Sequence, residues 1–192
     1  MSNIYNEIIN SAAKAISNAS DRELASEAFS ERVFNSLKIN PPKIDLEKTN
    51  VQIKTEEISL RNAPPGISFS MNGPTLVECA IYSIPVSGKM DIFISIIGPL
   101  IDRRKTYIEH SKLYYKEYSN ERISGNENLI HAIKNRVIAF TTNVNNLLSQ
   151  FEQQANQFNE TNLKLTIAQV IKSEIIKRNL KSDSESKLNP FA

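Results

Sequence analysis

The chain has 192 residues, of which 40% are hydrophobic and 23% charged, and its formal net charge is +2. This composition can fill a hydrophobic core and excludes a globally disordered chain. The small net charge gives no reason by itself to expect nucleic-acid binding. Five glycines and no tryptophan disfavour an enzyme built on glycine-rich phosphate loops.

Cys79 is the only cysteine, so the chain cannot form an internal disulfide or a cysteine-based zinc site. This predicts a cytoplasmic protein. The thiol lies in the apolar run 76–84, which predicts a buried small side chain. No basic segment followed by an apolar block begins the sequence, so no signal peptide is expected. The apolar stretch 92–101 is too short to span a bilayer, and we predict no membrane partner.

The pattern of residues 3–38 predicts two helices. These two helices make up the predicted N-terminal helical pair, which spans residues 1–40. Isoleucine and alanine side chains recur on one face of the first helix, from Ile4 to Ala19. Ser20 and Glu23 have the spacing of a capping box, which begins the second helix. Asn40 precedes two prolines and ends it, because a residue before proline avoids helical angles.

Residues 41–122 change to a period of two and predict an antiparallel β domain of about five strands. The phase of the alternation shifts, which predicts turns or bulges near 48–50 and near Glu56. No helix is expected between most of the strands, so the sheet should be antiparallel. The candidate segments for these strands lie near 44–46, 51–53, 58–60, 69–71, 75–84, 91–98, 106–108 and 112–118.

Residues 126–180 contain no glycine or proline, and their apolar side chains recur at helical spacing. We call the first part of this pattern the seam, and its members are Ile130, Ile133, Val137, Phe140, Val144, Leu147, Phe151 and Phe158. The polar residues 159–162 fit a bend, which predicts a helical hairpin of residues 127–157 and 162–181 within the segment 123–181. One continuous helix is the alternative. Residues 182–192 are predicted to be a flexible tail.

Catalytic and metal-binding patterns are weak in this sequence. Ser87-Gly88-Lys89 lacks the rest of a phosphate-binding loop and predicts a hairpin turn. His110 and His131 have no second ligand at a metal-binding spacing. The acids of the strand region are dispersed, so a hydrolase is the weakest hypothesis. We predict no catalytic residue, no metal site and no cofactor.

Two basic segments could instead contact an anionic partner. Residues 103–122 carry six basic and three acidic side chains, interleaved with four tyrosines. Positive charge with stacking rings can bind single-stranded nucleic acid, although an edge strand protected by charge explains the same pattern. The residues of this alternative site are Arg103, Arg104, Lys105, Tyr107, Lys112, Tyr114 and Lys116. The basic side chains of residues 164–181 predict a solvated helix face.

Several short motifs carry a resemblance. The segment 31–44 leads from a helix into a proline-containing link, and Ile84-Pro85-Val86-Ser87-Gly88 ends a strand. Phe158-Asn159 with Leu163 and Lys177-Arg178-Asn179-Leu180 with Asp183 follow in the last third. Over residues 25–190 the chain resembles a family of uncharacterised bacterial proteins from multi-gene systems such as anti-phage defence loci. Val86 and Lys89 depart from the aromatic and acidic residues of that family. The resemblance implies no reaction and no catalytic residue.

Together these patterns predict an α+β fold with an N-terminal helical pair, an antiparallel sheet and a long C-terminal helical hairpin. The predicted function is a non-enzymatic interaction or assembly component of a bacterial multi-protein system. Its partner would be another protein or a second copy, bound through the seam, because a chain of this size can hardly cover so long an apolar ridge. Nucleic-acid binding through residues 103–122 is the alternative.

Overall fold

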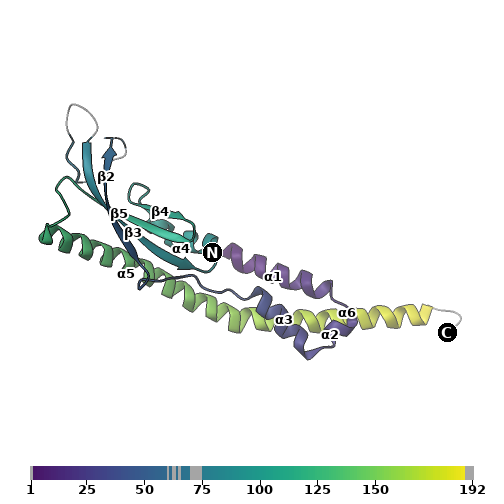
Figure 1. Cartoon of the computed structure of the whole chain (residues 1–192). Helices are drawn as coiled ribbons and strands as arrows, with labels where there is room; N and C mark the ends of the chain where they lie inside the picture. Colours follow the sequence, from purple (N-terminus) through teal and green to yellow (C-terminus); the bar gives the residue numbers. More distant parts are fainter. Residues whose placement is uncertain (1, 60, 62–63, 65, 70–74, 189–192) are drawn as a thin grey trace. The chain divides into compact units, whose positions relative to one another are not determined.

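The computed structural model describes residues 2–59, 61, 64, 66–69 and 75–188. It confirms the predicted α+β class, with helices towards both ends of the sequence and an antiparallel sheet of five strands (Figure 1). The chain divides into two compact units. The helical unit combines Met1–Ile39 with Gln153–Ala192, and the sheet unit is Asn40–Glu152.

The helical unit begins with α1 (Ser2–Ser17), α2 (Asp21–Leu24) and α3 (Glu27–Leu37). The predicted capping box is confirmed at the start of α2. The backbone N–H of Glu23 donates to the Ser20 hydroxyl oxygen at 3.3 Å, and the backbone N–H of Ser20 donates to the Glu23 carboxylate at 2.9 Å. These two bonds satisfy donors that a helix start leaves without intrahelical partners.

The second predicted helix is interrupted between Leu24 and Glu27, which separates α2 from α3. Leu24 and Phe29 are both buried, at 6% exposure each. On one straight helix, side chains five residues apart would point about 140° away from each other. The interruption therefore lets both side chains enter the core of the helical unit.

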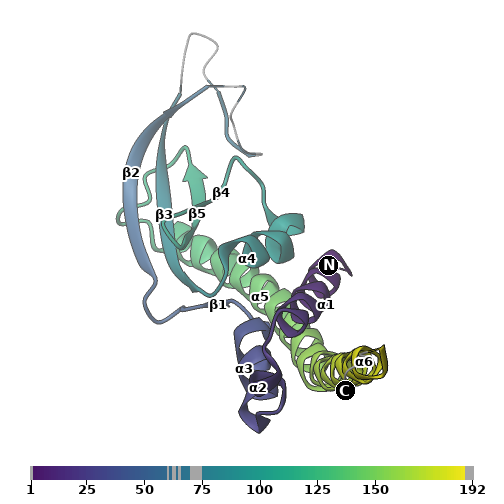
Figure 2. The same ribbon diagram turned by 90° about the vertical axis from the view of Figure 1, so that its right-hand side faces the viewer.

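The sheet unit contains β1 (Lys43–Ile44), β2 (Asn50–Ile58), β3 (Thr75–Ser87), β4 (Thr106–Glu109) and β5 (Lys112–Ser119). β3 is the central strand, because β5 pairs along one side and β1 and β2 pair along the other. Figure 2 shows β2 along the outside of the sheet. The predicted strands at 75–84, 106–108 and 112–118 are confirmed.

Three details of the strand prediction fail or fall outside the described residues. β2 keeps an unbroken register with β3 from Asn50 to Ile58, so no turn interrupts it near Glu56. Phe69 lies in no strand. Met71 lies outside the residues that the structure describes. The phase shift near Glu56 arises because Ile58 and Val51 face opposite sides of the sheet.

The predicted strand 91–98 is wrong, since this segment forms helix α4 (Met90–Ile97) followed by the 3₁₀ turn η2 (Gly98–Leu100). The buried side chains of α4 are Ile92, Phe93, Ile96 and Ile97, a spacing that places them on one helical face. The β-branched residues favoured a strand by propensity, but burial of this face decides the conformation.

Gly88 turns the chain from β3 into α4, so Ser87-Gly88-Lys89 is a turn but does not join two strands. Its φ of +95° lies in the left-handed region, where glycine has no steric cost. A Cβ atom at this position would lie 2.8 Å from Cα of Pro42. Glycine is therefore required here both by the backbone angle and by the close approach of the link before β1.

The predicted C-terminal hairpin is also wrong, because the helix does not reverse. α5 (Glu127–Gln157) continues through a π-helical segment, η3 (Phe158–Leu163), into α6 (Lys164–Leu188), as Figure 1 shows. Gln157 and Lys164 keep right-handed helical angles on either side of η3. No glycine or proline interrupts this segment. The polar residues that suggested a bend are accommodated inside the helix instead.

The same continuity corrects the predicted tail. Residues 182–188 belong to α6, and each of them is exposed. The remaining residues of the predicted tail, 189–192, lie outside the described residues. A run of polar and serine residues therefore forms the solvated end of a helix here.

Candidate interaction surface

The seam residues of α5 contribute to the chain's own core. Ile133 and Val137 form a buried cluster with Ala80, Tyr115 and Ile123 of the sheet unit. Ile130 and Phe140 pack against the same cluster, and the Phe140 ring stacks on Tyr115 with centroids 4.3 Å apart. One face of the sheet therefore covers the first half of the seam.

The other seam residues are also buried or half-buried. Val144 is 0% exposed, Phe151 is 2% and Phe158 is 8%, and Leu147 is half-buried. In the helical unit, the Phe158 ring lies 4.5 Å from the ring of Tyr5. This corrects the expectation that the seam lacks cover within the chain. A surface for a partner must be sought elsewhere.

A buried carboxylate neutralises part of the predicted basic segment. Glu117 is 2% exposed and lies on the sheet face that α5 covers. Its Oε1 accepts hydrogen bonds from the Tyr115 hydroxyl at 2.6 Å and from Lys105 Nζ at 3.1 Å. Its Oε2 accepts a bond from Arg136 Nε at 2.9 Å. Burial and the bond to Glu117 raise the pKa of Tyr115, so its hydroxyl remains a donor.

Two further cations of this segment bind carboxylates within the chain. Arg104 donates to Asp102 through Nε at 3.0 Å and through a terminal nitrogen at 3.1 Å, which is a bidentate pair. Lys116 Nζ donates to Glu56 of β2 at 2.8 Å. With Lys105 bound to Glu117, much of the positive charge predicted to attract phosphate is balanced internally.

Three other members of the alternative nucleic-acid site lie on the opposite face of the sheet, namely Tyr107, Lys112 and Tyr114. Tyr114 and Lys116 alternate along β5 with Tyr115 and Glu117, so they face away from α5. Tyr107 stacks on Tyr114 with centroids 4.5 Å apart and an interplanar angle of 1°. Tyr107 is 38% exposed, and Arg103 and Lys112 are exposed as well. The structure thus places an aromatic pair on the same face of the sheet as the exposed Lys112.

Strand β2 presents the longest exposed edge of the sheet. Among the strands that the structure describes, it pairs only with β3. Every side chain from Asn50 to Glu57 is exposed except half-buried Glu56. Such an edge offers backbone N–H and C=O groups for pairing with another strand.

Exposed apolar side chains accompany this edge. Val51 is 51% exposed and Ile53 is 45% exposed. Both lie on the same face of the sheet, since Val51 pairs with Tyr82 and Ile53 with Ala80. Leu76, which is 67% exposed, lies on this face opposite Glu57. We call Val51, Ile53 and the backbone edge of β2 the β2 surface.

Val51 and Ile53 were predicted to lie in a strand, but not on its exposed surface. Alternating apolar and polar residues are typical of a strand with one buried face. The available signal was the density of polar residues around them, because Gln52, Lys54 and Thr55 leave the strand only two apolar side chains before Ile58.

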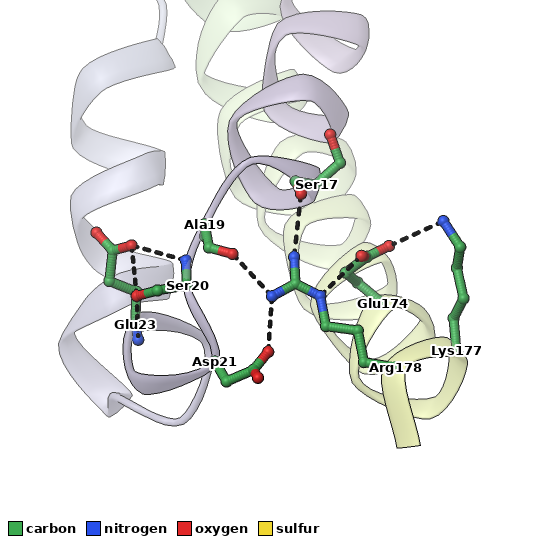
Figure 3. A network of polar contacts seen from close by, with 8 residues as sticks. All are labelled: Ser17, Ala19, Ser20, Asp21, Glu23, Glu174, Lys177 and Arg178. Atoms are coloured by element: carbon green, nitrogen blue, oxygen red, sulfur yellow. Dashed lines mark hydrogen bonds and ion pairs between the residues drawn. The ribbon is translucent and has the colours of Figure 1, made fainter. Parts of the chain in front are cut away.

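A polar network holds the helical unit together, as Figure 3 shows. Arg178 of α6 donates to the backbone carbonyls of Ser17 at 3.0 Å and Ala19 at 2.8 Å. It also binds the carboxylates of Asp21 at 2.7 Å and Glu174 at 2.9 Å. Because Arg178 binds carbonyls at the C-terminal end of α1, it complements the negative end of that helix dipole. The Nε, Nη1 and Nη2 groups of Arg178 thus all donate hydrogen bonds within the helical unit.

Cys79 and the two histidines have no described catalytic setting. Cys79 is 0% exposed, as predicted, and burial raises the pKa of its thiol to about 12. His110, with φ +47°, lies in the turn between β4 and β5, and His131 is exposed. Over the described part of the chain, no three His, Cys, Asp or Glu side chains are placed to share a metal ion.

No protein-family model, curated protein or solved structure matches the chain in the three comparisons that we made. The bacterial family suggested by short motifs therefore stays a prediction. Within residues 2–59, 61, 64, 66–69 and 75–188, no helix has both the length and the apolar character needed to cross a membrane.

Proposed function

We propose that this chain is a non-enzymatic protein-interaction module that binds its partner through the β2 surface. The observation that carries this proposal is the long exposed edge of β2, on which the side chains of Val51 and Ile53 are about half exposed to solvent. An added strand would pair with the backbone of β2, and its own side chains would pack beside these two.

The charges of β2 support selective rather than indiscriminate pairing. Exposed edges commonly carry charged side chains that oppose aggregation. Here Lys54 and Glu56 lie on one face, and Glu57 lies near the end of the strand on the other. An incoming strand would have to avoid placing like charges opposite them, because such cross-strand pairs are destabilising. The apolar and charged positions of β2 together therefore restrict which partner sequences can pair with it.

The cellular setting is proposed from the sequence resemblance alone. We propose that the module serves a bacterial multi-protein system, for which anti-phage defence is one example. The interaction itself does not depend on this assignment, and it is tested by the protein's own contacts.

Site-specific photo-cross-linking tests the proposed surface in the full chain. A benzophenone amino acid at Ile53 is expected to form a discrete adduct when cells producing the protein are irradiated. The control is the same amino acid at Ile138, which is 61% exposed on α5 but lies outside β2. If Ile53 gives no more adduct than Ile138, the β2 surface is not the contact site.

Nucleic-acid binding is the second candidate, and the stacked pair of Tyr107 and Tyr114 favours it. Single-stranded nucleic acid binds to aromatic platforms flanked by positive charge. Short fluorescent oligonucleotides would be titrated at low and high salt, and binding should weaken as salt increases. The test variants are Tyr107→Ala and Arg103→Glu. The absence of binding at low salt would exclude this function.

A further inference from the structure

We propose that the partner of β2 is the β2 strand of a second copy of this chain, paired antiparallel with Ile53 opposite Ile53. This inference rests on the proposed function and specifies its partner. The two copies would form one continuous sheet across a two-fold axis. The sequence of β2 and the faces that its side chains occupy lead to this register.

Symmetry limits the possible registers. Paired residues must lie on the same face of the joined sheet, and the two-fold axis is perpendicular to that sheet. One residue must therefore face its own copy, and the axis passes midway between the two copies of that residue. We call this self-paired residue the centre of the register. Within Asn50–Ile58, at least seven residues of each strand are paired when the centre is Ile53, Lys54 or Thr55.

Two of these three registers bring unsuitable side chains together. A centre at Lys54 places Lys54 opposite Lys54 and Val51 opposite Glu57. The first pair repels, and the second leaves an apolar side chain against a charge. A centre at Thr55 places Ile53 opposite Glu57 and Gln52 opposite Ile58. Neither register brings the exposed apolar side chains into contact with each other.

A centre at Ile53 matches both faces of the strand. On the face of α5, Ile53 meets Ile53 and Val51 meets Thr55, so every side chain in this row is β-branched. Such residues pack well across neighbouring strands. On the other face, Gln52 meets Lys54 and Asn50 meets Glu56, and no like charges are directly opposed.

This register is also compatible with the contacts that β2 already makes. Glu56 accepts hydrogen bonds from Lys116 at 2.8 and 3.1 Å within its own chain. The side-chain amide of Asn50 in the second copy can donate to the same carboxylate, because an ionised carboxylate has about four acceptor sites. Pairing would therefore keep the ion pair between Glu56 and Lys116.

Cysteine cross-linking in the full chain tests the register. Directly opposed cysteines in adjacent antiparallel strands are close enough to form a disulfide. With oxidised glutathione, Ile53→Cys is expected to form a covalent dimer at least about tenfold faster than Lys54→Cys or Thr55→Cys, since pairing raises the local thiol concentration. Ile138→Cys measures random collision. Native Cys79 is 0% exposed and should not interfere.

A second pair of variants tests the dimer without a cross-link. The unmodified chain is expected to show a concentration-dependent dimer in analytical ultracentrifugation. Ile53→Glu places two carboxylates opposite each other and should give a monomer, while Ile138→Glu should still dimerise. Circular dichroism checks that both variants fold. If Ile53→Cys does not fold, a mixture of Val51→Cys and Thr55→Cys chains reports the same register by mixed-disulfide formation.

Each outcome decides a different point. Faster cross-linking at Lys54 or Thr55 would overturn the register. A monomer at every concentration, with no Ile53→Cys dimer above the Ile138→Cys rate, would overturn the second copy as partner. In that case, a photo-adduct of a different protein at Ile53 would still support the proposed interaction function, and its absence would remove both.

Discussion

Glu117 shows how one buried residue can organise several others. A carboxylate removed from water is tolerated only when charges and hydrogen-bond donors replace its hydration. Tyr115, Lys105 and Arg136 supply three such donors to Glu117. The donors come from β5, from the segment just before β4 and from α5. The network therefore joins the sheet to the helix that covers it.

Replacing Glu117 with glutamine should destabilise the chain by roughly 2–4 kcal/mol. Glutamine is similar in size but leaves the positive charge of Lys105 without its partner, and only 22% of that side chain is exposed. Urea unfolding followed by circular dichroism would measure the change. The matched control is Glu109→Gln on β4, where the side chain is exposed. Equal loss in both variants would show that burial of Glu117 has no special role.

Asn159 is a second buried polar residue, and its side chain bonds to the backbone of a distant residue. It is 7% exposed within the π-helical segment η3. Its Oδ1 accepts from the backbone N–H of Ile39 at 3.0 Å, and its Nδ2 donates to the carbonyl of Ile39 at 2.9 Å. One amide thus satisfies both backbone groups of Ile39, two residues after the end of α3.

Asn159→Asp should cost roughly 2–4 kcal/mol at neutral pH, because a charge is buried and the Ile39 carbonyl loses its donor. The loss should shrink as the pH falls through the range where this carboxyl group protonates, since the protonated form can donate again. Thermal unfolding at several pH values would test this. Asn162→Asp, at an exposed position of the same segment, is the control.

At the scale of elements, the start of α2 couples stability to pH. Hydrogen bonds from the backbone and side chain of Ser20 lower the pKa of Glu23 below its usual 4.5. A depressed pKa means that the stabilisation is complete above the unfolded-state pKa and is lost as the pH falls through the folded-state pKa. The melting temperature should therefore drop more steeply below pH 4.5 in the unmodified chain than in Glu23→Gln, which has no group to titrate there. Parallel curves would contradict the capping contribution.

Elements with strong local signals were predictable from the sequence. The capping box of Ser20 and Glu23 fixes a helix start through its own side chains, and the glycine at 88 marks a turn. The antiparallel strands β3 and β5 followed from their composition and from the absence of long crossovers. These features depend on neighbouring residues, so they can be recognised without knowing the tertiary structure.

Other elements depended on contacts that the sequence does not display. α4 has the composition of a strand, and its conformation follows from burying Phe93 and Ile97 on one face. The polar residues 159–162 suggested a bend. Asn159 is instead buried in the helix, because its side-chain amide finds a partner 120 positions away, at Ile39. The seam of α5 was recognised, but its cover was assigned to a partner because the position of the sheet was unknown.

At the scale of the whole molecule, each unit has its own stabilising contacts. The sheet unit contains the cluster of Ile133, Val137 and Ala80. The helical unit joins α1 and α6 through Arg178 and buries Leu163 and Ile167 completely. Its two segments lie at opposite ends of the sequence. Removing one end should therefore affect the two units unequally.

Deleting residues 1–39 should leave α6 without the α1 carbonyl that Arg178 binds and without the Ile39 backbone groups that Asn159 binds. Hydrogen exchange in residues 164–188 should then approach that of an unprotected helix, since short helices without packing are marginal in water. The amides of β3 and β5 should keep their protection in the same experiment. Continued protection of α6 would show that it needs no N-terminal helices.

The division of the helical unit between the two chain ends has a consequence for synthesis. Residues 1–39 leave the ribosome long before residue 153 is added. At a translation rate of roughly 5–20 residues per second, the delay is on the order of 10 s. Ile16 and Phe29 are buried in the folded chain. During this delay their side chains cannot yet pack against residues 153–192, the other segment of the helical unit. We expect nascent-chain chaperones to bind residues 1–39 until residues 153–192 have been synthesised and can pack against them.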